Sequence, residues 1–175
     1  VWTVTDASNN TNTCTITVSV NDNEDPTITC VANPTRSTDP DVCTYTVVGN
    51  EFDPSFDDNC PGADISNNYN NAASLAGAVF PKGTTTVVWT VTDASNNTNT
   101  CTITVTVNDN EAPTITCATG TTRNTDPGVC TYTVQGTEFD PTFADNCPGA
   151  FVRNNYNDAA SLAGAVFPKG TTTVV

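Results

Sequence analysis

The chain has 175 residues, with 19 acidic and 5 basic side chains and no histidine, so its formal net charge is −14. Such a charge repels nucleic acid and anionic membrane surfaces, and we expect neither as a partner. No apolar run approaches the roughly 20 residues that a membrane-spanning helix needs, so this segment predicts no membrane insertion.

The chain contains an internal repeat with an offset of 87 residues, because Val1 aligns with Val88 and every later residue follows without a gap. Of the 88 aligned pairs, 72 are identical. A fixed period defines the structural unit. We therefore expect residues 1–21 to be the last two strands of a preceding copy, residues 22–108 a complete copy, and residues 109–175 a copy truncated before its last strand. The pattern predicts a longer native protein built as a tandem array.

Eight cysteines occur, four in each period: Cys14, Cys30, Cys43, Cys60, Cys101, Cys117, Cys130 and Cys147. Their spacing lacks the CxxC pairs of zinc sites, and no histidine is available as a ligand. Cysteines at this density in a small unit rich in threonine and asparagine indicate disulfides, and hence an oxidising, extracytoplasmic location.

In chain order, the first full copy opens with a predicted strand at 27–30, after Pro26. Residues 31–42 carry turn signals, and 43–48 form the next predicted strand. A loop follows at 51–62. Weaker strand signals occur at 63–69 and 75–80, the latter also compatible with a turn of helix.

Two long strands close the copy. Val87, Trp89 and Val91 alternate with polar or smaller residues, and the alternation resumes from Cys101 to Val107 after a turn at 93–97. A period of two predicts strands with one apolar face. About seven short strands in fewer than 90 residues predict an all-β fold of the β-sandwich type.

The motifs PTITC, TDPxVC and DNC, followed by FPKGTTTVVWTVTDASNNT at 80–98, resemble the hyalin repeat, an immunoglobulin-like extracellular module. The resemblance covers the whole period. It implies tandem immunoglobulin-like sandwiches stacked end to end, without catalytic activity. Near-identical copies of this composition are similar to the giant surface adhesins of gliding Bacteroidota.

The resemblance therefore implies a stalk repeat of a long filamentous adhesin at the extracellular cell surface, which serves cell adhesion and gliding motility. Its partners are then the neighbouring repeats and an unknown surface or glycan target. The alternative is a recognition module that binds a glycan or a protein through exposed loops. Exposed aromatic residues would favour it: Trp89 belongs to the predicted core, whereas Tyr69 and Phe151 are candidates for exposure.

Strand polarity brings three acidic loops to one pole of each copy: the linker at 22–24, the loop around Asp58 and the turn that starts at Asp93. Carboxylate and carbonyl oxygens are the ligands that Ca²⁺ takes. We expect calcium at these positions, whose ligands are Asp22, Asn23, Glu24, Asp58 and Asp93, with the counterparts Asp109, Asn110, Glu111 and Asp145. The linker also resembles the calcium-binding linker of cadherins, with one extra residue before the proline. The alternative is that these residues are ordinary turn formers on a solvated surface.

The same polarity predicts the disulfides. It places Cys30 and Cys43 at one pole and Cys60 and Cys101 at the other, and a disulfide spans no more than about 7 Å between Cα atoms. The expected pairs are Cys30–Cys43, Cys60–Cys101 and Cys117–Cys130, which leave Cys14 and Cys147 without partners in the chain.

Glu51 and Asp53 are the only pair that suggests general acid and base catalysis. Without a histidine or a cleft-forming insertion, we expect no enzyme activity. Lys82 and Lys169 each lie beside Pro-Gly or Pro-Lys-Gly turns, where a solvated lysine is expected; the alternative is an amide crosslink to an Asn or Asp side chain.

Overall fold

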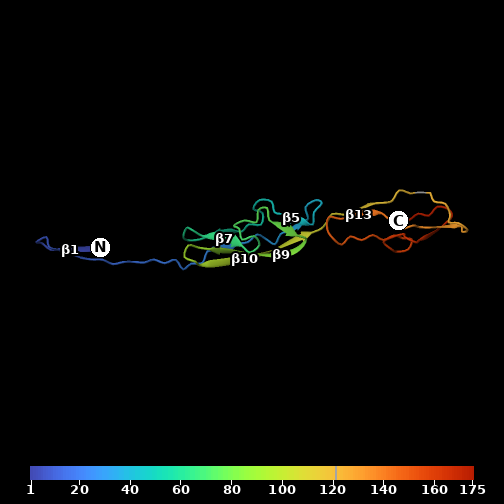
Figure 1. Ribbon diagram of the computed structural model, residues 1–175. Helices are drawn as coiled ribbons and strands as arrows, with labels where there is room; N and C mark the ends of the chain where they lie inside the picture. The colour runs from blue at the N-terminus through green and yellow to red at the C-terminus, as the bar shows by residue number, and fades with distance from the viewer. Residues whose placement is uncertain (121) are drawn as a thin grey trace. The chain divides into compact units, whose positions relative to one another are not determined.

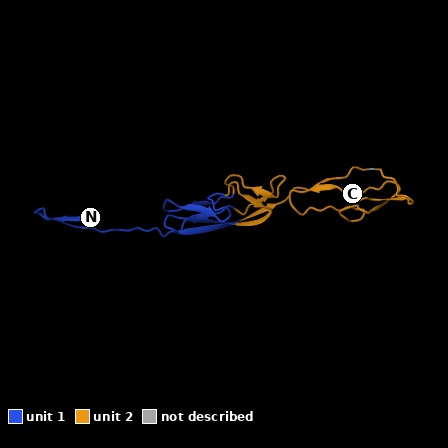
Figure 2. Ribbon diagram, in the orientation of Figure 1, with its two compact units in different colours: residues 1–31, 52–74, 87–103 blue, residues 32–51, 75–86, 104–175 orange. Residues whose placement is uncertain are grey.

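The computed structural model describes residues 1–120 and 122–175, and these residues form strands and turns without a helix. The predicted all-β class is therefore confirmed. None of the described residues forms a helix long and apolar enough to cross a membrane. Contacts divide the chain into two compact units: unit 1 contains residues 1–31, 52–74 and 87–103, and unit 2 contains residues 32–51, 75–86 and 104–175 (Figure 2).

The strands are short except for one pair (Figure 1). Unit 1 contains β1 (Trp2–Thr5), β2 (Thr11–Cys14), β3 (Thr27–Thr29), β6 (Ser55–Asp57) and β7 (Asp64–Asn67). Unit 2 contains β4 (Thr35–Ser37), β5 (Thr44–Thr46), β8 (Val79–Pro81), β11 (Thr114–Thr116), β12 (Thr131–Thr133), β13 (Thr142–Ala144) and β14 (Val166–Pro168). The long strands β9 (Gly83–Thr92) and β10 (Thr98–Asn108) contribute residues to both units.

Strand pairing repeats with the sequence. A four-stranded sheet has the order β4-β10-β9-β7. The antiparallel pair β3–β6 corresponds to β11–β13, and the antiparallel pair β5–β8 corresponds to β12–β14. The register is also the same, since Tyr45 faces Phe80 and Tyr132 faces Phe167. The two copies of the sequence thus form the same local pairs.

The alternation predicted for the long strands is confirmed. In unit 1, Val87, Trp89, Val91 and Ile103 are 0% exposed. In unit 2, the apolar face of β10 continues with Val105 and Val107, and Leu75 and Phe80 are also fully buried. Burial of one side of a strand fixes its register, because a slip of one residue would turn every apolar side chain to solvent.

The turn between β9 and β10 is closed by its own aspartate. The Asp93 Oδ1 atom accepts hydrogen bonds from the backbone amides of Ser95, at 2.9 Å, and Asn97, at 2.7 Å. Asn96 has a φ of 70°, a left-handed conformation that asparagine tolerates. The expected turn at 93–97 is therefore present.

Two strands lie in segments where turns or loops were expected, namely β4 within 31–42 and β6 within 51–62. β4 pairs with β10 in parallel, with Thr35 opposite Thr106. Before it, the Asn33 side chain accepts from the Thr104 amide and the Pro34 carbonyl from the Thr106 amide. The segment after Cys30 therefore runs beside β10 as an extended edge strand. The prolines near it had favoured a turn instead.

The predicted disulfide pairs are wrong. The structure joins Cys30 to Cys101, with 5.8 Å between Cα atoms, and Cys43 to Cys147, with 4.8 Å. In the described part of the chain, the unpaired cysteines are Cys14, Cys60, Cys117 and Cys130, all exposed. The error comes from treating 31–42 as a turn: because this segment runs along β10, Cys30 lies beside Cys101 at its beginning and Cys43 follows at its end.

The two tryptophans provide a test of the core. Trp89 is 0% exposed, whereas its counterpart Trp2 is 69% exposed. Trp89→Ala should lower the free energy of unfolding by about 3–5 kcal/mol through lost burial and a cavity. The matched variant Trp2→Ala should change it by no more than about 0.5 kcal/mol. Denaturant unfolding followed by circular dichroism measures both, and equal effects would contradict the assigned core.

Candidate metal centre

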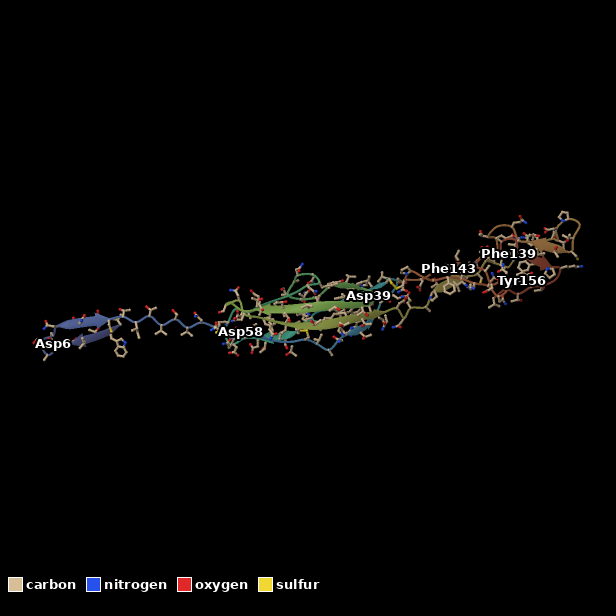
Figure 3. The ribbon with its side chains drawn as sticks, turned by 90° about the horizontal axis from the view of Figure 1, so that it is seen from below. Asp6, Asp39, Asp58, Phe139, Phe143 and Tyr156 are labelled. Carbon is tan, nitrogen blue, oxygen red and sulfur yellow. A yellow bond between two sulfur atoms is a disulfide. The ribbon has the colours of Figure 1, made fainter. Side chains whose placement is uncertain are left out.

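Three carboxylates meet in unit 1. Asp22 comes from the linker before β3, Asp58 from the loop after β6 and Asp93 from the β9–β10 turn, and each offers an oxygen within 4.8 Å of the other two. Asp58 is labelled in Figure 3. The structure thus brings together one aspartate from each of the three loops that strand polarity assigned to one pole.

The position of Asp93 is set by its turn. The same turn exists at Asp6 in the partial copy at residues 1–21. The Asp6 Oδ1 atom accepts from the amides of Ser8 and Asn10, both at 2.8 Å. A hydrogen bond from the Asn10 side chain is the main cause that lowers the pKa of Asp6. Asp6 is exposed, whereas Asp93 is 5% exposed. The local sequence therefore builds the turn, and the fold adds the other two carboxylates.

The carboxylates of Asp22 and Asp58 differ in the hydrogen bonds that they accept. The Glu24 amide donates to Asp22 Oδ1 at 3.1 Å, and this bond, followed by one from the Cys60 thiol, lowers the pKa of Asp22. Asp58 Oδ2 accepts from the Cys60 amide at 3.2 Å. Its Oδ1 atom is buried and has no hydrogen-bond partner among the described residues. A buried acceptor without a partner costs free energy, which a cation in this position would recover.

The spacing fits a calcium ion. Ca²⁺ binds oxygen at about 2.3–2.6 Å, so ligands on opposite sides of one ion lie about 5 Å apart. The 4.8 Å limit of this cluster is within that span. Asp22, Asp58 and Asp93 would hold the ion. The other two predicted ligands, Asn23 and Glu24, are exposed, and the Glu24 carboxylate is not part of the cluster.

The second predicted set lies in unit 2 and has a cation of its own. The Lys82 ammonium group is 3.1 Å from Asp109 Oδ2 and is the main cause that lowers the pKa of Asp109. Lys82 was expected to be a solvated turn residue; its side chain is 46% exposed, and the ion pair was not foreseen. Asp145 Oδ1, like that of Asp58, is buried without a hydrogen-bond partner in the described part of the chain.

The linker residues of this set contact the preceding copy. The Asn110 side chain donates to Ser37 Oγ at 2.9 Å, and Glu111 Oε2 accepts from the Asp41 amide at 3.1 Å. Sequence reasoning selected these two residues as metal ligands, but in the structure they hold the two copies together.

We call this region of unit 2 the repeat junction: residues 37–43 and 82 of the complete copy with residues 109–111 and 145–147 of the next. The Asn146 side chain donates to Thr38 Oγ1 at 3.2 Å and to the Val42 carbonyl at 3.1 Å. Beside these bonds, Cys43 and Cys147 are joined covalently. Asn146 belongs to the DNC motif, but the motif alone does not predict a contact with the neighbouring copy.

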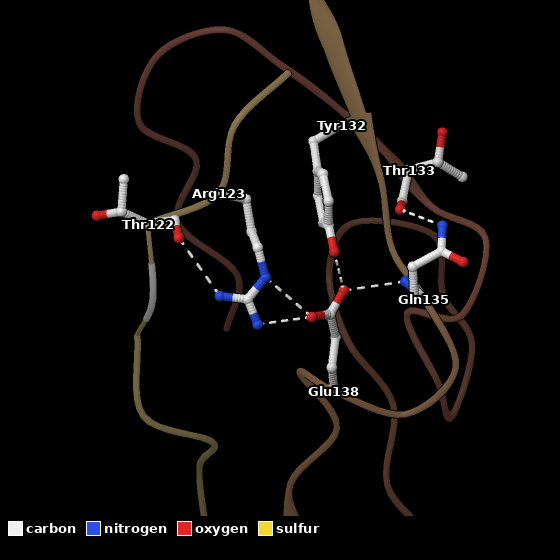
Figure 4. A network of polar contacts seen from close by, with 6 residues as sticks. All are labelled: Thr122, Arg123, Tyr132, Thr133, Gln135 and Glu138. Atoms are coloured by element: carbon white, nitrogen blue, oxygen red, sulfur yellow. Dashed lines mark hydrogen bonds and ion pairs between the residues drawn. The ribbon is translucent and has the colours of Figure 1, made fainter. Parts of the chain in front are cut away.

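Glu51, one half of the candidate acid–base pair, belongs to an ion-pair network. Its carboxylate accepts from Arg36, at 2.5 Å, and from the hydroxyl group of Tyr45. The second copy repeats the network with Arg123, Tyr132 and Glu138 (Figure 4). Asp53, the other half, accepts from the Ser74 hydroxyl at 2.6 Å. Both carboxylates therefore accept hydrogen bonds from neighbouring side chains, an arrangement that indicates a structural role and not proton transfer.

In a comparison with protein families, residues 21–107 match the family model of the HYR domain. A comparison of the chain with curated proteins gave no match.

The Glu138 network predicts a pH dependence. Hydrogen bonds from Tyr132 and from the Gln135 amide, with Arg123, lower the pKa of Glu138 from 4.5 to about 2. A lowered folded-state pKa contributes stability that is fully present above pH 4.5 and is lost as the pH falls toward 2. Glu138→Gln should therefore remove part of the decline in Tm over this interval.

The matched control is Asp158→Asn, which removes an ion pair to Arg153 whose side chains are 61% and 82% exposed. Solvent screens such a pair, so this variant should keep the wild-type slope. If the two variants shift the pH profile equally, the network does not hold Glu138 ionised.

Proposed function

Because residues 21–107 are a HYR domain, a cell-surface and adhesion-type module without enzyme activity, we propose that the chain is a stalk segment of a long filamentous cell-surface adhesin. The disulfides and the HYR domain support an extracellular location. The resemblance of the tandem copies to surface adhesins of gliding bacteria adds gliding motility to the proposal.

The observation that carries the proposal is the repeat junction. A recognition module on a flexible linker needs no contact with its neighbour, whereas a stalk transmits force from copy to copy. Within unit 2 the two copies share a disulfide, the Lys82–Asp109 ion pair and four hydrogen bonds from Asp41, Asn110 and Asn146. These contacts occupy the linker residues that would otherwise act as a hinge, so they favour end-to-end stacking.

We further propose that Ca²⁺ binds Asp22, Asp58 and Asp93, and binds the counterparts Asp109 and Asp145 at the repeat junction. An ion at the acidic cluster would tie the linker to two loops of the copy that it precedes. This would stabilise the folded state by RT ln(1 + [L]/Kd).

The stalk role is tested by small-angle X-ray scattering of a chain of several tandem copies. We expect the cross-section of a rod and a maximum dimension that grows linearly with copy number. The control carries Asn146→Ala and Lys82→Ala, which remove junction contacts outside the core. A broad distribution of interdomain angles in the unmodified chain would contradict the stalk.

Calcium binding is tested by melting the chain in excess chelator and in millimolar Ca²⁺. The Tm should rise with calcium, and Asp58→Asn should abolish the rise because it removes the carboxylate with the buried, unpaired oxygen. The control is Asp6→Asn, which changes the same type of turn at a position where the described residues form no acidic cluster. An unchanged Tm in the unmodified chain would mean that no ion binds.

The alternative function, recognition of a glycan or a protein, is favoured by exposed aromatic side chains, of which Phe151 is the most exposed among the described residues. Phe151 is 78% exposed, with the Arg153 guanidinium 5.9 Å from its ring centroid. Trp89 is fully buried and unavailable for stacking on a sugar. A glycan array separates the two functions: saturable binding that Phe151→Ala removes would assign recognition to the copy, and absence of binding agrees with a stalk.

A further inference from the structure

The disulfide Cys43–Cys147 joins residues 104 positions apart, and the repeat assigns its two ends to different copies. Cys147 is the counterpart of Cys60, so the second copy supplies the cysteine that the first copy leaves exposed. Cys130, the counterpart of Cys43, is exposed in the same way. We propose that this disulfide is one rung of a covalent ladder, in which every copy is bonded to the next across the linker.

The ladder accounts for each unpaired cysteine. A step of 104 residues sends Cys130 to a cysteine of a following copy and Cys60 to a cysteine of a preceding one. A step of 71 residues, as in Cys30–Cys101, assigns Cys117 and Cys14 each to a further cysteine of its own copy. Within the described residues no other cysteine is free. One bond within each copy and one bond between copies thus use all four cysteines of the period.

The residues that align the rung recur in both copies. Asn146 holds the segment before Cys147 against Val42, the residue before Cys43. Its counterpart is Asn59, and the counterpart of Val42 is Val129. Cys60 and Cys130 therefore stand beside the same alignment residues as the bonded pair.

Formation of each rung is an oxidation. Two thiols lose two protons and two electrons as the S–S bond forms. The oxidant is a disulfide, either a small one or that of a thiol–disulfide oxidoreductase, which is reduced to two thiols through a mixed disulfide. The rung then persists in the oxidising surroundings that the cysteine content indicates.

The ladder changes what carries tension. The linker 109–113 lies inside the loop closed by Cys43–Cys147 and outside the loop closed by Cys30–Cys101. If the linker is cut or stretched, only the disulfide between copies therefore still connects its two sides. With the rungs formed, the covalent path through one copy shortens from 87 residues to the 17 between the positions of Cys130 and Cys147, about 60 Å instead of about 300 Å when extended.

The first experiment uses the chain with Cys14, Cys60, Cys117 and Cys130 changed to serine, which prevents exchange. Glu24 is changed to glutamine as well, so that Glu111 is the one exposed glutamate among the described residues. Cleavage after the exposed Glu111 by a glutamyl endopeptidase cuts the linker. The nicked chain should run as one species without reductant and as two with it. Two species without reductant would overturn the rung.

Matched variants separate the two disulfides. Cys147→Ser should release the fragments without reductant, whereas Cys30→Ser should not, because that bond does not span the linker. If Cys147→Ser fails to fold, the non-reduced peptide map of the parent chain decides instead. A Cys43–Cys147 peptide supports the rung, and a Cys30–Cys43 peptide refutes it.

The ladder itself is tested by counting free thiols in chains with one or two further copies. With the rungs formed, alkylation in denaturant should find four free thiols at every length, the number in this chain. Without them, the number should rise by two for each added copy. This count is independent of the stalk proposal, because a ladder can form in an array that scatters as a flexible chain.

Discussion

The apolar face shared by β9 and β10 is the constraint on which the rest of the structure depends. Its side chains, from Val87 and Trp89 to Val107, are 0–2% exposed, while threonines occupy the opposite face. The turn that joins the strands keeps them in register through Asp93. The same carboxylate is then presented to Asp22 and Asp58. Closure of the core and assembly of the candidate metal centre thus use one turn.

Local pattern predicted this hairpin and its turn because both follow from short-range rules: alternation at period two and side-chain hydrogen bonds within five residues. It did not predict β4, three polar residues that pair with β10 about 70 positions away. The disulfide pairs were predicted wrongly for the same reason, since the prediction depended on the path of the backbone between Cys30 and Cys43. The prediction also paired cysteines only within a copy, so it did not include a disulfide between copies such as Cys43–Cys147.

The candidate site was predictable in part. The convergence of Asp22, Asp58 and Asp93 required only the end of the copy at which each loop lies, and chain polarity supplies that information. To predict which of the adjacent linker residues joins the cluster, the path of the backbone through the linker would have to be known. The amide of Glu24 turns back to Asp22, which leaves its side chain in solvent. The Arg36–Glu51 pair spans 15 residues without a periodic signal, so sequence inspection missed it.

Lys82 connects the proposed calcium site with the repeat junction. It pairs with Asp109, the counterpart of Asp22, so an ammonium group of the complete copy lies beside a proposed calcium ligand of the next copy. Without the ion, a lysine that is 46% exposed holds the linker by an interaction worth only about 0–1 kcal/mol. The disulfide between copies does not depend on whether Ca²⁺ is bound. If both proposals hold, connectivity of the array depends on cysteine oxidation, and calcium would adjust how stiffly the connected copies are held.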